Sequence, residues 1–211
     1  MNKTEVEELS KQQLLDLESQ LQSESDLLIK NLGILETLSK YGQPEIVGSK
    51  KMGLMIKKDV DIACPVDDFG VETWVKVCAD LLRTQQIRRI TPINYVDYDK
   101  NGFYSPGNPD AFSYYISFNK LSLPFIENSQ EWEVQIHLLK KPGLDALQKA
   151  EEIIKQLDDE TKESILRIKL FVKEVLVRSS GPERIDSPTI YKAVLEESVR
   201  TTEDFLKYIK K

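Results

Sequence analysis

The two ends of the chain carry the apolar spacing of helices. Between residues 4 and 40 leucines recur at intervals of three and four residues, which places them along one helix face. The polar run at residues 23–26 predicts a break into two helices, and Gly42 is typical of a position just past a helix end. The same spacing returns from Leu144 onward, and Ser187-Pro188 predicts the start of a last helix. We therefore expect no strand after residue 143.

The middle of the chain alternates between apolar and polar residues instead. Residues 131–139 have the period of a half-buried strand. Residues 44–66 read as strand, loop and strand, residues 87–98 and 111–118 as further strands, and residues 71–82 as a helix with its apolar residues on one face. In residues 131–139, Trp132, Val134, Ile136 and Leu138 share one face, and Glu131, Glu133, Gln135 and His137 share the other. This order predicts an α+β fold, with a small mixed sheet and flanking helices in residues 1–142 and an all-helical region in residues 143–211.

Composition narrows the class of protein. The chain has 211 residues, of which 40% are hydrophobic and 30% charged, as is usual for a globular protein with a sizeable core. It carries 29 basic and 35 acidic residues, and this balance argues against a nucleic-acid partner, because phosphate contacts need positive charge. Cys64 and Cys78 have apolar neighbours and no metal-ligand spacing, so we expect core positions. The polar first residues and the lack of a long apolar run predict no signal peptide, no membrane span and a cytoplasmic location.

The candidate chemistry lies in residues 47–66, VGSKKMGLMIKKDVDIACPV. Gly48-Ser49 allows a tight turn and close approach of the backbone to a phosphate. Asp59 and Asp61 have the spacing that points both carboxylates to one face of a strand. Neighbouring carboxylates repel each other unless a cation lies between them, and Mg²⁺ or Mn²⁺ suits oxygen ligands shared with substrate phosphates. The pattern predicts phosphoryl or nucleotidyl transfer.

This stretch resembles the signature of the nucleotidyltransferase superfamily of the polymerase-beta type. That signature is an apolar residue, Gly, then Gly or Ser, a gap, and a strand that reads acid, apolar, acid, apolar. Here it reads Val47-Gly48-Ser49, nine residues, and Asp59-Val60-Asp61-Ile62. Gly53-Leu54 and Lys57-Lys58 resemble, more loosely, the GrpB-like branch. The alternative is an ordinary Gly-Ser turn followed by a strand with a solvent-facing Asp-Val-Asp edge.

The resemblance implies a metal-dependent transfer of a nucleoside monophosphate from a nucleoside triphosphate to an acceptor. It implies metal ligation by Asp59 and Asp61 and phosphate binding by Gly48 and Ser49. In the superfamily a third acid lies on a later strand between apolar residues, and Trp132-Glu133-Val134 matches that form. Glu133 would then hold the metal that activates the acceptor. Glu131 is the competing candidate for the third acid. The alternative for Glu133 is that it merely belongs to the polar face of a half-exposed strand.

Other residues complete the set of candidates. His137 lies on the same face as Glu133, about 13 Å further along the strand, which is too far to share an ion. It is a candidate substrate contact or base, or a structural residue. Four lysines bracket the motif, and we expect Lys50 and Lys58 to contact the triphosphate, unless they are merely solvated. The other two lysines are Lys51 and Lys57. The candidates for lining an acceptor pocket are Tyr104, Asn108, Tyr114 and Tyr115.

Three hypotheses follow from these residues. The first is a Mg²⁺-dependent nucleotidyltransferase, whose acceptor we expect to be a small molecule. The second is a non-catalytic module on the same fold that binds a nucleotide or another protein. The third is a polymerase that modifies nucleic acid, which the acidic balance disfavours. The acceptor, the nucleotide base and the oligomeric state stay open at this point.

Overall fold

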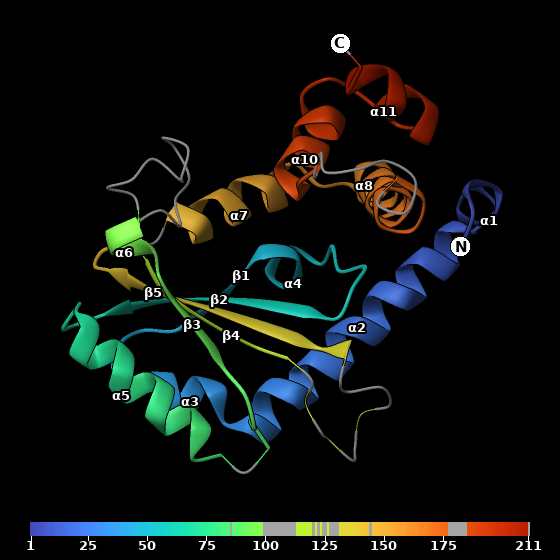
Figure 1. Cartoon of the computed structure of the whole chain (residues 1–211). Coiled ribbons are helices and arrows are strands. Elements are labelled where there is room, and N and C mark those ends of the chain that lie inside the picture. Colours follow the sequence, from blue (N-terminus) through green and yellow to red (C-terminus); the bar gives the residue numbers. More distant parts are fainter. Residues whose placement is uncertain are drawn as a thin grey trace. The chain divides into compact units, whose positions relative to one another are not determined.

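The computed structural model describes residues 1–84, 86–98, 113–119, 121, 123, 126, 131–143, 145–176 and 185–210 (Figure 1). The chain folds as two compact units. One consists of Met1–Leu21, Gly53–Ile56 and Glu152–Lys211, and the other of Gln22–Met52 and Lys57–Glu151. The predicted α+β class is confirmed, because the second unit holds a mixed sheet and the described residues from 145 onward are helical apart from their connections. The division of domains after residue 142 stays a prediction, and the two compact units group the chain differently.

The sheet brings strands together that are far apart in sequence. Its order is β1-β2-β5-β4-β3, in which β2 and β5 are parallel and the other neighbours are antiparallel. The register of the parallel pair sets Asp59 opposite Glu133 and Asp61 opposite Gln135. The strands are β1 (Glu45–Val47), β2 (Asp59–Val66), β3 (Thr91–Asn94), β4 (Ser113–Phe118) and β5 (Glu133–Lys140).

The two faces of this sheet differ in polarity. Val60, Ile62, Val134 and Ile136 are fully buried on one face, as the alternation in residues 131–139 predicts. Helix α5 (Val71–Leu82) packs on this side, since the Trp74 and Tyr114 rings stack with their centroids 5.2 Å apart. The opposite face carries the polar residues of β2 and β5, and at one end a small apolar cluster. That cluster contains Val47, Ala63 and Leu139, with Ala146 and Leu147 of α7 (Asp145–Gln156) packed against it.

Long-range pairing explains why α2 (Lys11–Leu32) runs unbroken through residues 23–26. Ser25 is fully buried, and its hydroxyl donates to the Gln22 carbonyl oxygen over 2.6 Å. Glu24 and Asp26 form ion pairs with Lys58 and Lys50. The polar run is therefore part of the packing, and the predicted break there is wrong. The helix ends before Gly33, which has a φ of +57° and precedes α3 (Ile34–Leu38).

Other segments depart from the predicted elements more locally. Helix α5 has the predicted bounds, but Val71, Val75 and Leu82 are about half exposed while Thr73, Val77 and Leu81 are buried. Its predicted apolar side is thus divided, because Trp74 packs on the sheet while the three half-exposed residues face solvent. The predicted strand at residues 87–98 is shorter, because Thr91–Asn94 leads into α6 (Tyr95–Tyr98). The loop after Val47 contains α4 (Gly48–Met52).

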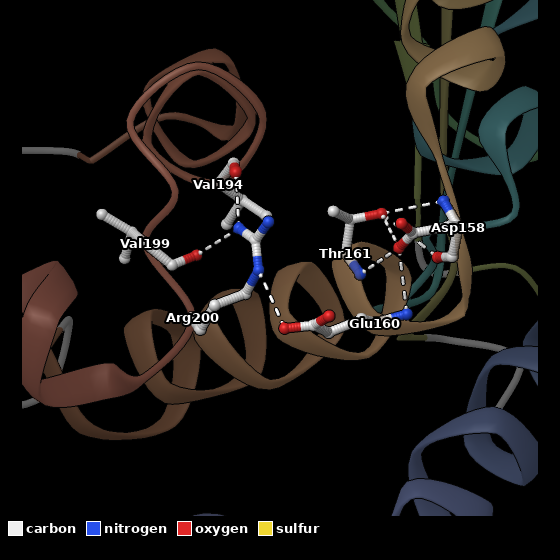
Figure 2. A network of polar contacts seen from close by, with 6 residues as sticks. All are labelled: Asp158, Glu160, Thr161, Val194, Val199 and Arg200. Atoms are coloured by element: carbon white, nitrogen blue, oxygen red, sulfur yellow. Dashed lines mark hydrogen bonds and ion pairs between the residues drawn. The ribbon is translucent and has the colours of Figure 1, made fainter.

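The first unit is helical throughout its described elements. Asp158 caps the start of α8 (Asp159–Phe171) with its side chain (Figure 2). The predicted last helix is divided, because α10 and α11 are separated by a segment in which Ser198 has a φ of +55°. None of the described helices combines the length and apolar character that crossing a membrane requires. Besides parts of α2 and α7, the unit contains α1 (Lys3–Glu7), α8 (Asp159–Phe171), a π-helical turn (Val172–Leu176), α10 (Ser187–Leu195) and α11 (Thr202–Tyr208).

Candidate metal and nucleotide site

Asp59 begins β2 and is the most deeply placed carboxylate of the predicted site. The residue is only 7% exposed, and its backbone N–H donates to the Lys57 carbonyl oxygen over 3.0 Å. Its Oδ2 lies 2.5 Å from the Lys57 ammonium nitrogen. Within the described part of the chain, its Oδ1 is buried and accepts no hydrogen bond. A buried carboxylate oxygen without a partner is costly, so this atom is where a ligand is expected.

Asp61 follows on the same face of β2 and lies against the Gly48 turn. Gly48 has a φ of +63°, a conformation that L side chains rarely adopt. A Cβ at this position would lie 2.3 Å from Asp61 Oδ2. Glycine is therefore needed here for its conformation and for the close approach of the second carboxylate. The predicted turn and the predicted metal strand meet at this contact.

Glu133 and Glu131, the two candidates for the third acid, occupy different positions. Glu133 is the first residue of β5 and pairs in register with Asp59, so both side chains leave the same face of the sheet. Its N–H donates to the Lys58 carbonyl oxygen over 2.9 Å, which aligns the starts of the two strands. Glu131 precedes the strand, is exposed and lies 3.9 Å from the Lys58 ammonium. The structure thus brings Glu133, and not Glu131, next to Asp59 in the sheet.

These carboxylates fit a hard divalent cation by their chemistry. Asp59 and Asp61 offer oxygen donors on one face, and Asp59 Oδ1, which has no hydrogen-bond partner among the described residues, is available for a ligand. Mg²⁺ usually takes only one or two protein carboxylates, and phosphate and water oxygens complete its shell. Among the residues that the structure describes, no three His, Cys, Asp or Glu side chains converge as a complete metal site. Any ion held here would therefore depend on oxygens from substrate or water.

Both lysines predicted to contact phosphate are engaged with acidic side chains. Lys50 is 8% exposed, and its ammonium lies 2.7 Å from Asp26 Oδ1 and 3.2 Å from Gln22 Oε1. The Lys58 ammonium lies 3.3 Å from Glu24 Oε2, which also accepts a hydrogen bond from the Trp132 indole. The structure places a different lysine, Lys57, at the metal strand. Lys57 precedes β2, and its place beside Asp59 follows from the turn closed by the hydrogen bond from Asp59 N–H to the Lys57 carbonyl oxygen.

His137 lies further along β5, in a row of aromatic side chains. Its Nδ1 is 3.1 Å from Ser113 Oγ, and its ring centroid is 5.0 Å from that of Tyr115. It pairs in register with Ala63, which is four residues beyond Asp59 along β2. Its role as a substrate contact stays a prediction. Tyr114 packs on the opposite face against Trp74.

The last residues that the sequence analysis named are the two cysteines and two candidates for the acceptor pocket. Burial raises the pKa of the Cys64 thiol to about 12 and that of Cys78 to about 11, which suits packing and not reactivity. Both cysteines are free, and Cys64 is buried as the sequence predicts whereas Cys78 is half-buried. Tyr104 and Asn108 lie outside the described residues.

Comparison with known proteins supports the fold. No protein-family model matches the sequence, and no curated protein matches it either. Solved structures do match. A Cid1 poly(U) polymerase with MgGTP bound has a TM-score of 0.59 at 14% identity, over 83% of this chain and 50% of that one. A cytoplasmic RNA terminal U-transferase gives 0.58 at 15% identity, over 82% and 47%.

A GLD-2/RNP-8 complex also matches, with a TM-score of 0.54 at 12% identity over 88% of this chain and 64% of that one. This chain spans about half the length of the Cid1 and U-transferase chains. At these identities the likeness shows the fold alone, and the predicted polymerase-beta-type nucleotidyltransferase fold is confirmed. The GrpB-like branch stays a prediction.

Proposed function

We propose that this protein is a divalent-metal-dependent nucleotidyltransferase. The observation that carries the proposal is the buried Oδ1 of Asp59, which has no hydrogen-bond partner among the described residues. Asp59 lies on the same strand face as Asp61 and in register with Glu133. The Gly48 turn lies directly against Asp61, so a phosphate-binding turn and a metal-binding strand adjoin. This arrangement stands on a nucleotidyltransferase fold. An ordinary strand edge would not explain a buried carboxylate oxygen that lacks a partner.

The residues take the following roles in the proposed reaction. Asp59 and Asp61 hold the divalent cation together with the triphosphate, and the backbone at Gly48 and Ser49 lies against the phosphates. Glu133, next to Asp59, would hold the metal ion that activates the acceptor hydroxyl. The acceptor oxygen forms a bond to the α-phosphorus, the bond from that phosphorus to the bridging oxygen breaks, pyrophosphate leaves and the hydroxyl proton goes to solvent. Mg²⁺ or Mn²⁺ supplies charge neutralisation and a lowered pKa for the attacking hydroxyl.

The acceptor we propose first is the 3′ hydroxyl of an RNA. This rests on the solved structures of similar fold, which are described as an RNA terminal U-transferase and as poly(U) polymerases. The net charge of −6 supports the small-molecule acceptor expected from the sequence, because an RNA-binding surface usually needs excess basic residues. The two acceptors are therefore compared in one assay.

The decisive experiment compares Glu133→Gln with Glu131→Gln. Triphosphate binding is measured by calorimetry in the presence of Mg²⁺ or Mn²⁺, and transfer is measured with a short RNA and with small hydroxyl compounds. We expect the parent to bind and transfer. Glu133→Gln should bind about as well and transfer nothing, as expected of a group that acts mainly in the transition state. Glu131→Gln, the control two residues away, should transfer like the parent.

Each other outcome has a defined meaning. A dead Glu131→Gln variant with an active Glu133→Gln variant would assign the third acid to Glu131. A parent that binds triphosphate and transfers to no acceptor would favour the non-catalytic nucleotide-binding module. A parent that binds no triphosphate with either metal ion would contradict the proposed function.

A further inference from the structure

Lys57 stands at the solvent side of the buried Asp59 carboxylate. The hydrogen bond from Asp59 N–H to the Lys57 carbonyl oxygen closes a tight turn, and the ammonium reaches Asp59 Oδ2 at 2.5 Å. The Lys57 side chain is 46% exposed, whereas that of Asp59 is 8% exposed. The ammonium thus lies between the carboxylate and solvent, and its flexible stem lets it move into water.

The charge balance at Asp59 is incomplete without a further ligand. Among the described residues, Lys57 is the one cation that forms an ion pair with this carboxylate. It pairs with Oδ2 and leaves Oδ1 without a hydrogen-bond partner in the described part of the chain. Burying a carboxylate is strongly unfavourable unless it is paired, so the ammonium is needed when no other cation is bound. A divalent cation carries twice the charge and also takes the oxygen that Lys57 leaves.

We propose that Lys57 is a placeholder cation that occupies the metal position on Asp59 until metal and nucleotide arrive. The inference rests on the proposed function, because it takes Asp59 as a metal ligand. An ammonium and a divalent ion compete for Oδ2, so binding of metal alone requires the pair to break. The displaced ammonium then lies beside a second cation and repels it. The phosphates of a bound triphosphate give that ammonium a new anionic partner, so nucleotide strengthens metal binding.

The neighbouring lysines provide matched controls. Lys57→Met, Lys58→Met and Lys51→Met each remove one positive charge, so their effect on net charge is the same. The Lys58 ammonium is paired with Glu24 and Glu131, and Lys51 is exposed on α4. Only the Lys57 change removes the cation that lies on Asp59. Lys51→Met keeps the comparison valid if loss of the Lys58 ion pairs prevents folding.

The test measures binding of Mn²⁺ to the full chain, with free ion followed by electron paramagnetic resonance. Without nucleotide, we expect Lys57→Met to bind Mn²⁺ at least about 5-fold more tightly than the parent, the lower end of typical coupling between sites. The two control variants should stay within about twofold, below that range. A non-hydrolysable triphosphate analogue should tighten Mn²⁺ binding in the parent and less so in Lys57→Met. The metal-free Lys57→Met variant should also unfold at a lower temperature, and Mn²⁺ should restore its midpoint.

Failure of this inference and failure of the proposed function give different results. If the parent binds Mn²⁺ with the analogue but Lys57→Met has equal or weaker affinity for Mn²⁺ alone, the placeholder role is wrong and the metal site stands. If Lys58→Met or Lys51→Met tightens Mn²⁺ binding as much as Lys57→Met, the effect is general charge and the inference is also wrong. If neither the parent nor Lys57→Met binds Mn²⁺ with or without the analogue, both proposals fall.

Discussion

Two aspartates, one in each compact unit, begin secondary-structure elements in opposite ways. Asp158 caps α8, and its Oδ1 accepts from the Glu160 N–H over 3.1 Å and from the Thr161 N–H and hydroxyl over 2.8 Å each (Figure 2). Asp158 is exposed to solvent. Asp59 begins β2, is buried and has one oxygen paired with Lys57 and the other without a partner in the described structure.

The difference separates a structural carboxylate from a candidate functional one. The oxygen of Asp158 satisfies amide groups that the first turn of a helix leaves open, and Arg200 extends this network from Glu160 to the carbonyl oxygens of Val194 and Val199 (Figure 2). In the described structure, Asp59 Oδ1 accepts a hydrogen bond from no such group. Burial of an ionised group with incomplete partners costs stability, and proteins keep such groups mainly at sites that bind or react.

The largest expected effect comes from mutating each of these two aspartates and comparing nucleotide binding with stability. Asp59→Asn should weaken Mg²⁺-dependent triphosphate binding by more than about 100-fold, because losing even an outer-shell partner of a metal ligand costs about 10- to 100-fold. Its metal-free unfolding midpoint should be unchanged or higher, because the buried charge is gone. Asp158→Ala should do the reverse, with a lower midpoint and unchanged binding. Calorimetry and thermal unfolding of both variants measure this crossing pattern.

Asp61→Asn serves as the companion to Asp59→Asn. It should lose binding as well, since both carboxylates leave the same face of β2. If both variants bind triphosphate as the parent does, Asp59 is an ordinary buried aspartate and the contrast with Asp158 has no functional meaning.

The parts of the fold that sequence reasoning predicted correctly depend on local periodicity. The alternation in residues 131–139 placed Glu133 and His137 on the polar side of β5, and the helix at residues 71–82 has the predicted bounds. Asp59 and Asp61 share a strand face for the same reason. These features follow from a few neighbouring residues, so one sequence is enough to find them.

The features that were missed depend on contacts between distant residues. The polar run in α2 does not break the helix, because Asp26 pairs with Lys50, which is 24 residues further along the chain. That pairing also gives the Lys50 ammonium an acidic partner on α2, although Lys50 follows Ser49 directly in sequence. In α5, spacing identifies an apolar side, but only the packing of Thr73, Val77 and Leu81 decides which side is buried. Tertiary contacts thus override closeness in sequence at these positions.

A smaller effect is expected at the turn, where two glycines can be compared. Gly48 and Gly53 have nearly equal φ values, +63° and +67°, so alanine brings similar backbone strain at both. The added Cβ would lie 2.3 Å from Asp61 Oδ2 at position 48, but 3.4 Å from the nearest atom, Lys162 Nζ, at position 53. Gly48→Ala should therefore displace the Asp61 carboxylate by about 1 Å, a shift that can cost up to about 100-fold. Triphosphate binding with Mg²⁺ should weaken, and Gly48→Val should weaken it further.

Gly53→Ala is the control for strain alone. It should lower the unfolding midpoint about as much as Gly48→Ala and keep triphosphate binding within about threefold, the usual context spread of single contacts. Equal binding by both alanine variants would mean that the contact between Gly48 and Asp61 does not matter for the nucleotide, and the site would rest on Asp59 alone.

The smallest effect concerns the charge of Asp158 and appears in the dependence of stability on pH. Hydrogen bonds from the Thr161 backbone and hydroxyl, and then from the Glu160 backbone, hold the pKa of the Asp158 carboxyl below its usual value of 3.8. A folded pKa below the unfolded one adds stability that is fully present above the unfolded pKa and is lost as the pH falls through the folded pKa. Asp158→Asn keeps a neutral cap without the charge, so the parent should have the higher unfolding midpoint at pH 7, and the difference should shrink below about pH 4. Other carboxyl groups titrate alike in both proteins and cancel in the difference. A difference that stays constant from pH 7 to pH 3 would show that the ionised form of Asp158 is not what stabilises the start of α8, and the contrast with Asp59 would then rest on burial alone.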